Sequence, residues 1–147
     1  MQAAKNHIYI VLGTKAQMIK MAPILVELQR RGVPYTFIHT GQHKETMDDL
    51  IENFAIRRPD MYLYQGPDIT RLSQVLPWML RILYKTVRHR RQLFARKGIV
   101  LVHGDTFSTV LGALIGRVCG LKVAHVESGL RSFNIFHPFP EELTRLM

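Results

Sequence analysis

The sequence predicts an α/β fold, a Rossmann-like parallel sheet with helices on both faces. Two observations support this prediction. Short runs of β-branched and aliphatic residues alternate with longer stretches in which apolar residues recur at helical spacing. Most of the apolar runs also end in a short polar segment that contains glycine. Neighbouring parallel strands need a crossover connection, so this alternation favours helices packed on both sides of one sheet.

Five apolar runs are expected to be strands, the third being the weakest: residues 7–12, 34–40, 60–65, 99–102 and 122–126. Helices are expected over residues 18–31, 45–54 and 106–118, with a longer helix that begins at residue 70. Gly32 should end the first helix, because glycine adopts the left-handed conformation found just after a helix. Residues 128–140 should form a loop, and Glu141 should begin a further helix that the chain cuts off.

The long helix contains Pro77, which is expected to kink it or divide it in two. Its apolar spacing predicts one inward-facing set of side chains: Leu72, Val75, Leu76, Met79, Ile82 and Leu83. Basic residues between Arg81 and Lys97 interleave with aliphatic ones, which predicts a solvated helix face.

The composition is typical of one globular domain, since 47% of the 147 residues are hydrophobic. No apolar run approaches the roughly 18 residues of a membrane helix, so we expect no membrane insertion. The first residues lead into a strand without the apolar core of a signal peptide, which favours a cytoplasmic protein. Cys119 is the single cysteine, and we expect it to be a buried, inert thiol.

The net charge of +9 indicates a polyanionic partner, a phosphorylated ligand or a missing acidic partner. One interpretation is therefore a basic nucleotide- or nucleic-acid-binding module. The stretch from Arg81 to Lys97 lacks the interleaved exposed aromatics of a single-strand platform, so we expect no nucleic-acid partner.

Polar segments follow four of the expected strands, where the ligand crevice of an open parallel sheet lies. The usual strand order, 3-2-1-4-5, would open this crevice between the first and fourth strands. Lys15 and Asp105 would then face each other across it, with Glu127 one strand further on.

The segment from Gly13 to Lys15 could hold an anion at the start of a helix. Glycine permits close approach of the backbone, the helix amino terminus offers free N–H groups, and Lys15 and Lys20 add positive charge. The dinucleotide and P-loop glycine patterns are both absent, so a simple turn is the alternative.

Asp105 and Glu127 could act as acid and base if burial and mutual repulsion separate their pKa values. The alternative is structural: Asp105 caps the next helix through Thr106, and Glu127 pairs with Arg131. Glu141 could simply be an acid at a helix start. Three histidines are expected to be hydrogen-bonded core residues without zinc-site spacing: His39, His103 and His125.

Five strings, in register along the chain, resemble the non-hydrolysing UDP-N-acetylglucosamine 2-epimerases. They are Gly13–Pro23, Thr40–His43, Val102–Thr106, His125–Arg131 and Pro138–Glu142. The resemblance implies the first half of a glycosyltransferase-B-type, two-domain architecture, usually a homodimer. Residues 1–147 would be the amino-terminal Rossmann-like domain, truncated in its last helix. The second, UDP-binding domain would be absent from this chain, which alone should be inactive.

The resemblance also implies an isomerase that converts UDP-N-acetylglucosamine to UDP-N-acetylmannosamine, a precursor of cell-surface polysaccharides. UDP is eliminated and added back on the opposite face, without metal or other cofactor. Positions that match the family motifs then receive roles. The acid/base residues would be Asp105, Glu127 and Glu141. The substrate contacts would be Gly13, Lys15, Lys20, Gln42, His43 and Arg131.

One departure from the family concerns its usual first loop, Gly-Thr-Arg-Pro-Glu, where this chain has Lys15, Ala16 and Gln17. Lysine lacks the bidentate fork of arginine, and Gln17 removes a carboxylate, so substrate affinity or the sugar accepted could differ. The alternatives are an epimerase of a modified UDP-N-acetylhexosamine and a hydrolysing 2-epimerase that releases free N-acetylmannosamine.

Overall fold

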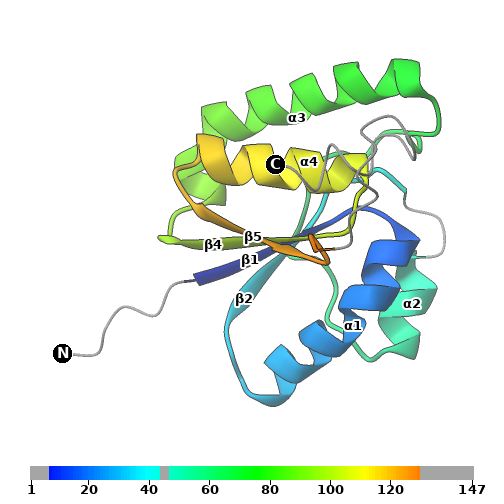
Figure 1. The fold of residues 1–147 in the computed structure, drawn as a ribbon, viewed down its shortest axis with the longest axis vertical. Helices are drawn as coiled ribbons and strands as arrows, with labels where there is room; N and C mark the ends of the chain where they lie inside the picture. The colour runs from blue at the N-terminus through cyan, green and yellow to red at the C-terminus, as the bar shows by residue number, and fades with distance from the viewer. Residues whose placement is uncertain (1–6, 44–46, 130–147) are drawn as a thin grey trace.

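The fold is built on five parallel strands in one sheet, as shown by a computed structural model that describes residues 7–43 and 47–129 (Figure 1). The strand order is β3-β2-β1-β4-β5, so the predicted order is confirmed. The strands are β1 (His7–Leu12), β2 (Tyr35–His39), β3 (Met61–Tyr62), β4 (Gly98–His103) and β5 (Lys122–Val126). Four strands match the expected positions closely.

The third strand is much shorter than the expected span of residues 60–65. β3 pairs with β2 through only two positions, Met61 with Ile38 and Tyr62 with His39. It lies at one edge of the sheet, and the chain then continues to Gly66 and Pro67, where proline has no N–H to donate.

Helices cover both faces of the sheet (Figure 1). One face carries α1 (Lys15–Arg30) and α2 (Met47–Asn53), and the other carries α3 (Leu72–Leu93) and α4 (Phe107–Val118). Alternate residues of β1 point into separate cores: Ile10 and Leu12 pack with α1, whereas Tyr9 and Val11 pack on the α3 and α4 side. Burial on both faces explains why the central strands are almost wholly apolar.

α1 begins at Lys15, three residues before the expected start at residue 18. Thr14 is its N-cap and forms a capping box with Gln17, in which each side chain accepts a backbone N–H of the other residue. The predicted end is confirmed, because Gly32 follows the last turn with φ +62° and donates its N–H to the Gln29 carbonyl.

α3 continues through Pro77, so division of the helix there, one of the two expected outcomes, does not occur. Pro77 removes the bond that would reach the carbonyl of Ser73, and Ser73 lies in the exposed first turn, where water can satisfy that carbonyl. The one departure from helical backbone angles within α3 is at His89.

The inward face of α3 also differs in part from the expected one. Its buried side chains are Val75, Trp78, Ile82 and Thr86. Leu72 and Leu76, expected inward, are instead 68% and 64% exposed. Apolar residues line two sides of this helix, and only one side can face the sheet.

The exposed apolar residues of α3 form what we call the α3 stripe: Leu72, Leu76, Leu80, Tyr84 and Val87. The basic residues between Arg81 and Lys97 are exposed, as predicted. Within the described residues, no helix has both the length and the apolar character needed to cross a membrane.

Candidate functional site

The carboxyl ends of the strands bring four polar segments together. The Thr40 and Ser108 hydroxyl groups lie 2.8 Å apart, joining the end of β2 to the start of α4. The His43 N–H donates to the Gly13 carbonyl over 2.9 Å, and the Gly104 N–H donates to the Val126 carbonyl over 3.1 Å. The predicted convergence of these loops is therefore present in the structure.

The centre of the site is a cluster of three ionisable side chains, Lys20, Glu127 and His103. Lys20 Nζ donates to both carboxylate oxygens of Glu127, at 2.8 and 2.9 Å. His103 Nε2 lies 3.1 Å from Glu127 Oε2. The cluster joins α1 to the ends of β4 and β5, which are far apart in the sequence.

Burial decides the protonation of His103, whose residue is only 4% exposed. Desolvation lowers the pKa of its imidazole, and this effect exceeds the opposite effect of the nearby Glu127 carboxylate. The lowered pKa favours the neutral imidazole at pH 7, with Nε2 in contact with the Glu127 carboxylate. Its Nδ1 is buried without a hydrogen-bond partner among the described residues.

Glu127 also has an unusual backbone conformation, with φ +67° at the end of β5. This left-handed region costs a residue with a side chain roughly 1–2 kcal/mol. Such strain persists only where surrounding contacts hold the residue, and the contacts that the structure gives this side chain include those to Lys20 and His103.

Gln17 connects the loop after β1 to the end of β4 and the start of α4. Its Oε1 accepts the N–H groups of Gly13, at 2.9 Å, and Thr14, at 3.2 Å. Its Nε2 donates to the His103 carbonyl over 2.7 Å and to Thr109 Oγ1 over 3.0 Å. Gln17 is only 1% exposed. All the hydrogen bonds of its side-chain amide are therefore made within the protein. The structure does not support the expectation that glutamine, in place of the family's usual glutamate, changes substrate affinity.

The helix amino terminus offers fewer free N–H groups than the sequence predicts. Gly13 and Thr14 donate to Gln17, and the Gln17 N–H donates back to Thr14 Oγ1. In the described part of the chain, the N–H groups of Lys15 and Ala16 have no protein partner, and both residues are exposed. Any anion held at this end of α1 would bind these two amides.

Packing requires a glycine at position 13. A Cβ atom at this position would lie 1.9 Å from Thr40 Oγ1 and 2.1 Å from Ser108 Oγ. Both distances are far shorter than van der Waals contact, so any side chain would push the second loop and α4 away from the first loop.

Gln42 is buried, and its Oε1 accepts hydrogen bonds from the Ser108 N–H, at 3.1 Å, and the Ser108 hydroxyl, at 2.6 Å. The side-chain oxygen of Gln42 therefore fixes the start of α4. Its side-chain nitrogen, Nε2, is the group that could contact a ligand. His43 is half-buried beside it.

Asp105 lies half-buried in the turn between β4 and α4, one strand away from β1 as expected. The N-cap residue of α4 is Thr106, whose side chain makes no capping hydrogen bond. Glu127 pairs with Lys20, while its expected alternative partner, Arg131, lies outside the described residues, as does Glu141.

The remaining histidines behave as structural residues. His39 is 1% exposed and accepts the Gly41 N–H at Nδ1 over 3.0 Å. His125 Nε2 lies 2.5 Å from the Gly104 carbonyl oxygen. Cys119, expected to be buried, is only half-buried, and desolvation raises the pKa of its thiol, which disfavours the reactive thiolate. Across the described ranges, no group of three or more His, Cys, Asp or Glu residues is placed to hold a metal ion.

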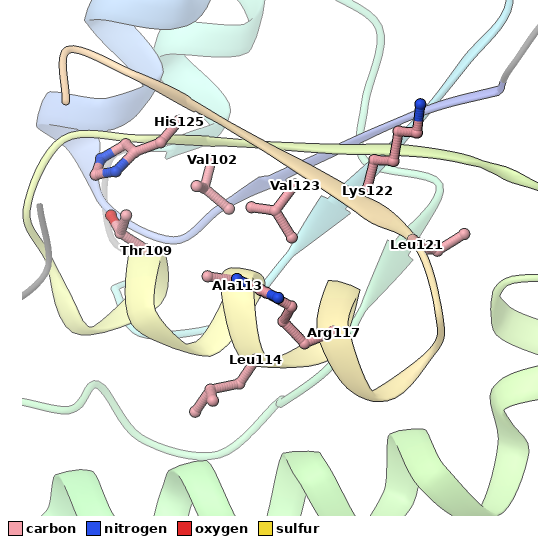
Figure 2. A pocket seen from close by; sticks show the side chains of 9 residues that line it. All are labelled: Val102, Thr109, Ala113, Leu114, Arg117, Leu121, Lys122, Val123 and His125. Atoms are coloured by element: carbon pink, nitrogen blue, oxygen red, sulfur yellow. The ribbon is translucent and has the colours of Figure 1, made fainter. Parts of the chain in front are cut away.

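A groove of about 600 Å³ runs between α4 and β5 (Figure 2). Thr109 and His125 lie at one end, while Leu121 and Lys122 lie at the other. Its middle is largely apolar, with Val102, Ala113 and Val123 among the lining residues. The Lys20–Glu127–His103 cluster does not line this groove, so the ionic chemistry lies outside it.

Sequence reasoning missed three residues of this site: Gln17, His103 and Thr109. The spacing of Thr14 and Gln17 is that of a capping box, which would have signalled a structural glutamine. His103 was expected only as a core histidine, because nothing in the sequence places its ring against Glu127.

Comparison with known proteins adds a family to this geometry. The family model for UDP-N-acetylglucosamine 2-epimerase matches residues 26–147. The chain is 36% identical over 147 residues to the UDP-N-acetylglucosamine 2-epimerase of Bacillus subtilis (strain 168), covering 97% of this chain and 36% of that protein. The chain thus spans about a third of the length of the curated relatives it matches.

Solved structures give the same result. The UDP-GlcNAc 2-epimerase from Neisseria meningitidis bound to UDP-GlcNAc is similar with a TM-score of 0.78 and 31% identity, over 95% of this chain and 37% of that one. The Methanocaldococcus jannaschii enzyme, in complex with UDP-GlcNAc and UDP, gives a TM-score of 0.77 and 28% identity, over 95% and 37%. The expected Rossmann-like fold class is confirmed, and this chain belongs to the UDP-N-acetylglucosamine 2-epimerase family.

Proposed function

We propose that this chain is the amino-terminal domain of a two-domain, glycosyltransferase-B-type UDP-N-acetylglucosamine 2-epimerase. The observation that carries the proposal is the Lys20–Glu127–His103 cluster, which lies at the carboxyl edge of the sheet in a member of this family. The product, UDP-N-acetylmannosamine, would supply cell-surface polysaccharides. A second domain would hold most of the UDP.

Inversion at carbon 2 requires removal of a proton that is not acidic. Expulsion of UDP makes this feasible, because loss of the C2 proton and of the C1–O bond gives a neutral 2-acetamidoglucal. Protonation of the opposite face at C2 and return of UDP to C1 then give the manno epimer. General acid and base groups must therefore lie on both sides of the sugar.

The proton transfers are assigned to Asp105, Glu127 and Glu141. Lys15 and Lys20 would bind the diphosphate and stabilise the negative charge that UDP carries as it leaves. The exposed N–H groups of Lys15 and Ala16 support a diphosphate at this end of α1. Further substrate contacts are assigned to Gly13, Gln42, His43 and Arg131. The hydrogen bond from the His43 N–H to the Gly13 carbonyl holds two of these residues together.

Lys20 would link nucleotide binding to proton transfer. Without substrate, Lys20 donates two hydrogen bonds to Glu127, which stabilise the charged carboxylate and weaken it as a base. A bound diphosphate would attract Lys20, so part of this stabilisation would be lost. Glu127 would then become more basic when the leaving group is in place.

The proposal includes a homodimer of the full-length enzyme and a cytoplasmic location, where UDP-sugars are made. The α3 stripe supports a protein contact, because five apolar side chains are exposed along one helix. The accepted sugar would be N-acetylglucosamine itself or a modified N-acetylhexosamine.

Product analysis tests this function. UDP-N-acetylglucosamine incubated with the 147-residue chain alone should give no manno epimer, because half of the cleft is missing. The same chain joined to the remaining two-thirds of a full-length enzyme should give steady conversion. Steady conversion by the chain alone, or none by the longer protein, would contradict the proposal.

A further inference from the structure

We infer that Gln17 and Thr109 are positioning residues, which together hold the turn that carries Asp105 in register with the anion-binding end of α1. This inference rests on the proposed function, since it assigns the two residues to that reaction. Neither side chain is expected to touch the substrate, because Gln17 and Thr109 are each only 1% exposed.

The brace is made of direct hydrogen bonds around one carbonyl group. The His103 carbonyl accepts from Gln17 Nε2 at 2.7 Å and from Thr109 Oγ1 at 2.6 Å. Gln17 Nε2 also donates to Thr109 Oγ1 at 3.0 Å. The two side chains and the carbonyl therefore form a closed triangle, in which each member fixes the other two.

The same glutamine shapes the first loop. Its Oε1 accepts the N–H groups of Gly13 and Thr14, so the N–H groups without a protein partner at this end of α1 are those of Lys15 and Ala16, among the described residues. The side-chain amide of Gln17 thus accepts hydrogen bonds from the loop after β1 and donates one to the end of β4, where the next loop begins. Because an amide is planar and rigid, the two loops cannot move independently while both sets of bonds persist.

The braced carbonyl belongs to a residue at the centre of the site. The His103 side chain lies 3.1 Å from Glu127, and its backbone carbonyl lies two residues before Asp105. Loss of the brace would let the turn shift and would misplace the Asp105 carboxylate and the His103 ring that contacts Glu127. A displacement of about 1 Å at reacting groups can lower a rate on the order of 100-fold.

One nearly isosteric variant tests the brace in the full-length enzyme, with a matched control. Thr109→Val removes a bridging hydroxyl. Thr86→Val removes an equally buried hydroxyl of α3 that has no hydrogen-bond partner in the described structure. Thr109→Val should lower kcat on the order of 10- to 100-fold with the circular dichroism spectrum unchanged, whereas Thr86→Val should leave kcat unchanged.

A double-mutant cycle separates positioning from general destabilisation. Gln17→Met and Thr109→Val disturb the same carbonyl, so their effects on kcat should be strongly non-additive, whereas Gln17→Met and Thr86→Val should be additive. Additive effects of Gln17→Met and Thr109→Val, or an unchanged kcat in Thr109→Val, would overturn the inference. If Gln17→Met does not fold, the comparison of Thr109→Val with Thr86→Val still decides.

Amide exchange in the 147-residue chain tests the brace without any activity. Thr109→Val should speed exchange at Gly104, which follows the braced carbonyl, and Thr86→Val should not. Unchanged exchange in Thr109→Val would contradict the brace itself. A wild-type enzyme without epimerase activity but with this exchange pattern would instead refute the proposed function and the catalytic role, and would leave only a structural brace.

Discussion

Glu127 has a left-handed backbone, accepts two hydrogen bonds from Lys20 and lies 3.1 Å from the buried His103 ring. A carboxylate that only stabilised the fold would not need a strained backbone at the end of a strand. We therefore interpret the strain as the cost of pointing this side chain toward Lys20 and His103.

Neutralising the carboxylates in the full-length enzyme separates catalysis from structure. Asp105→Asn and Glu127→Gln are nearly isosteric, so a purely structural carboxylate should lose only about 1 kcal/mol of stability. A residue that moves a proton should lose turnover by about 10² to 10⁴ while the fold survives, and we expect this of both residues and of Glu141→Gln. Turnover near wild type in Asp105→Asn and Glu127→Gln, with circular dichroism as the folding control, would leave the reaction without its acid and base.

Glu127→Gln, which should lower turnover, should strengthen anion binding. The substitution removes a negative charge 2.8 Å from Lys20 Nζ, so pyrophosphate should bind the 147-residue chain about 3- to 10-fold more tightly, as measured by calorimetry. Glu27→Gln is the matched control, because it neutralises a carboxylate paired with Arg30 at the far end of α1. Weaker binding in Glu127→Gln would show that Lys20 does not contact the anion.

His103 should make the protein less stable in mild acid. Burial lowers its pKa below the ordinary value of 6.5, so the unfolded chain binds the proton more tightly than the folded protein does. Stability should therefore fall as pH decreases below 6.5. His103→Gln should reduce this loss in urea titrations between pH 7 and 5.5, whereas His89→Gln, at an exposed position, should not. The same pH dependence in wild type and His103→Gln would contradict a buried neutral imidazole.

At the scale of the elements, hydrophobic patterning predicted the positions of the strands, because buried parallel strands are short and almost wholly apolar, while their order followed from the usual arrangement of this fold class. It failed where local hydrogen bonds or tertiary contacts decide. The start of α1 depends on the capping box of Thr14 and Gln17, and the inward face of α3 depends on which of its two apolar sides meets the sheet. The partners of Glu127 could not be predicted either, because they come from distant segments.

If the full-length enzyme forms the homodimer that we propose, the α3 stripe should carry its contact. Leu76 and Leu80 are 64% and 57% exposed, and burying a leucine is worth about 1.5–3 kcal/mol. Leu76→Gln together with Leu80→Gln should therefore weaken the dimer by at least about tenfold. Analytical ultracentrifugation measures this, with Val26→Gln as the control, since Val26 is 40% exposed on α1. An unchanged dimer in the leucine variant, or a weaker one in Val26→Gln, would place the contact elsewhere.

At the scale of the whole molecule, the described residues form one five-stranded sheet, and the chain spans about a third of the length of its relatives. The net charge of +9 fits the phosphorylated ligand that we propose, for which Lys15 and Lys20 would supply positive charge.

Solvent isotope incorporation tests the central claim most directly. The full-length enzyme that contains this chain is incubated with UDP-N-acetylglucosamine in D₂O, and the products are analysed by NMR and mass spectrometry. Proton removal and return at carbon 2 predict UDP-N-acetylmannosamine with one deuterium at that carbon. Epimer without deuterium at carbon 2, or UDP with free N-acetylmannosamine as the only products, would contradict a non-hydrolysing epimerase that works through elimination and re-addition.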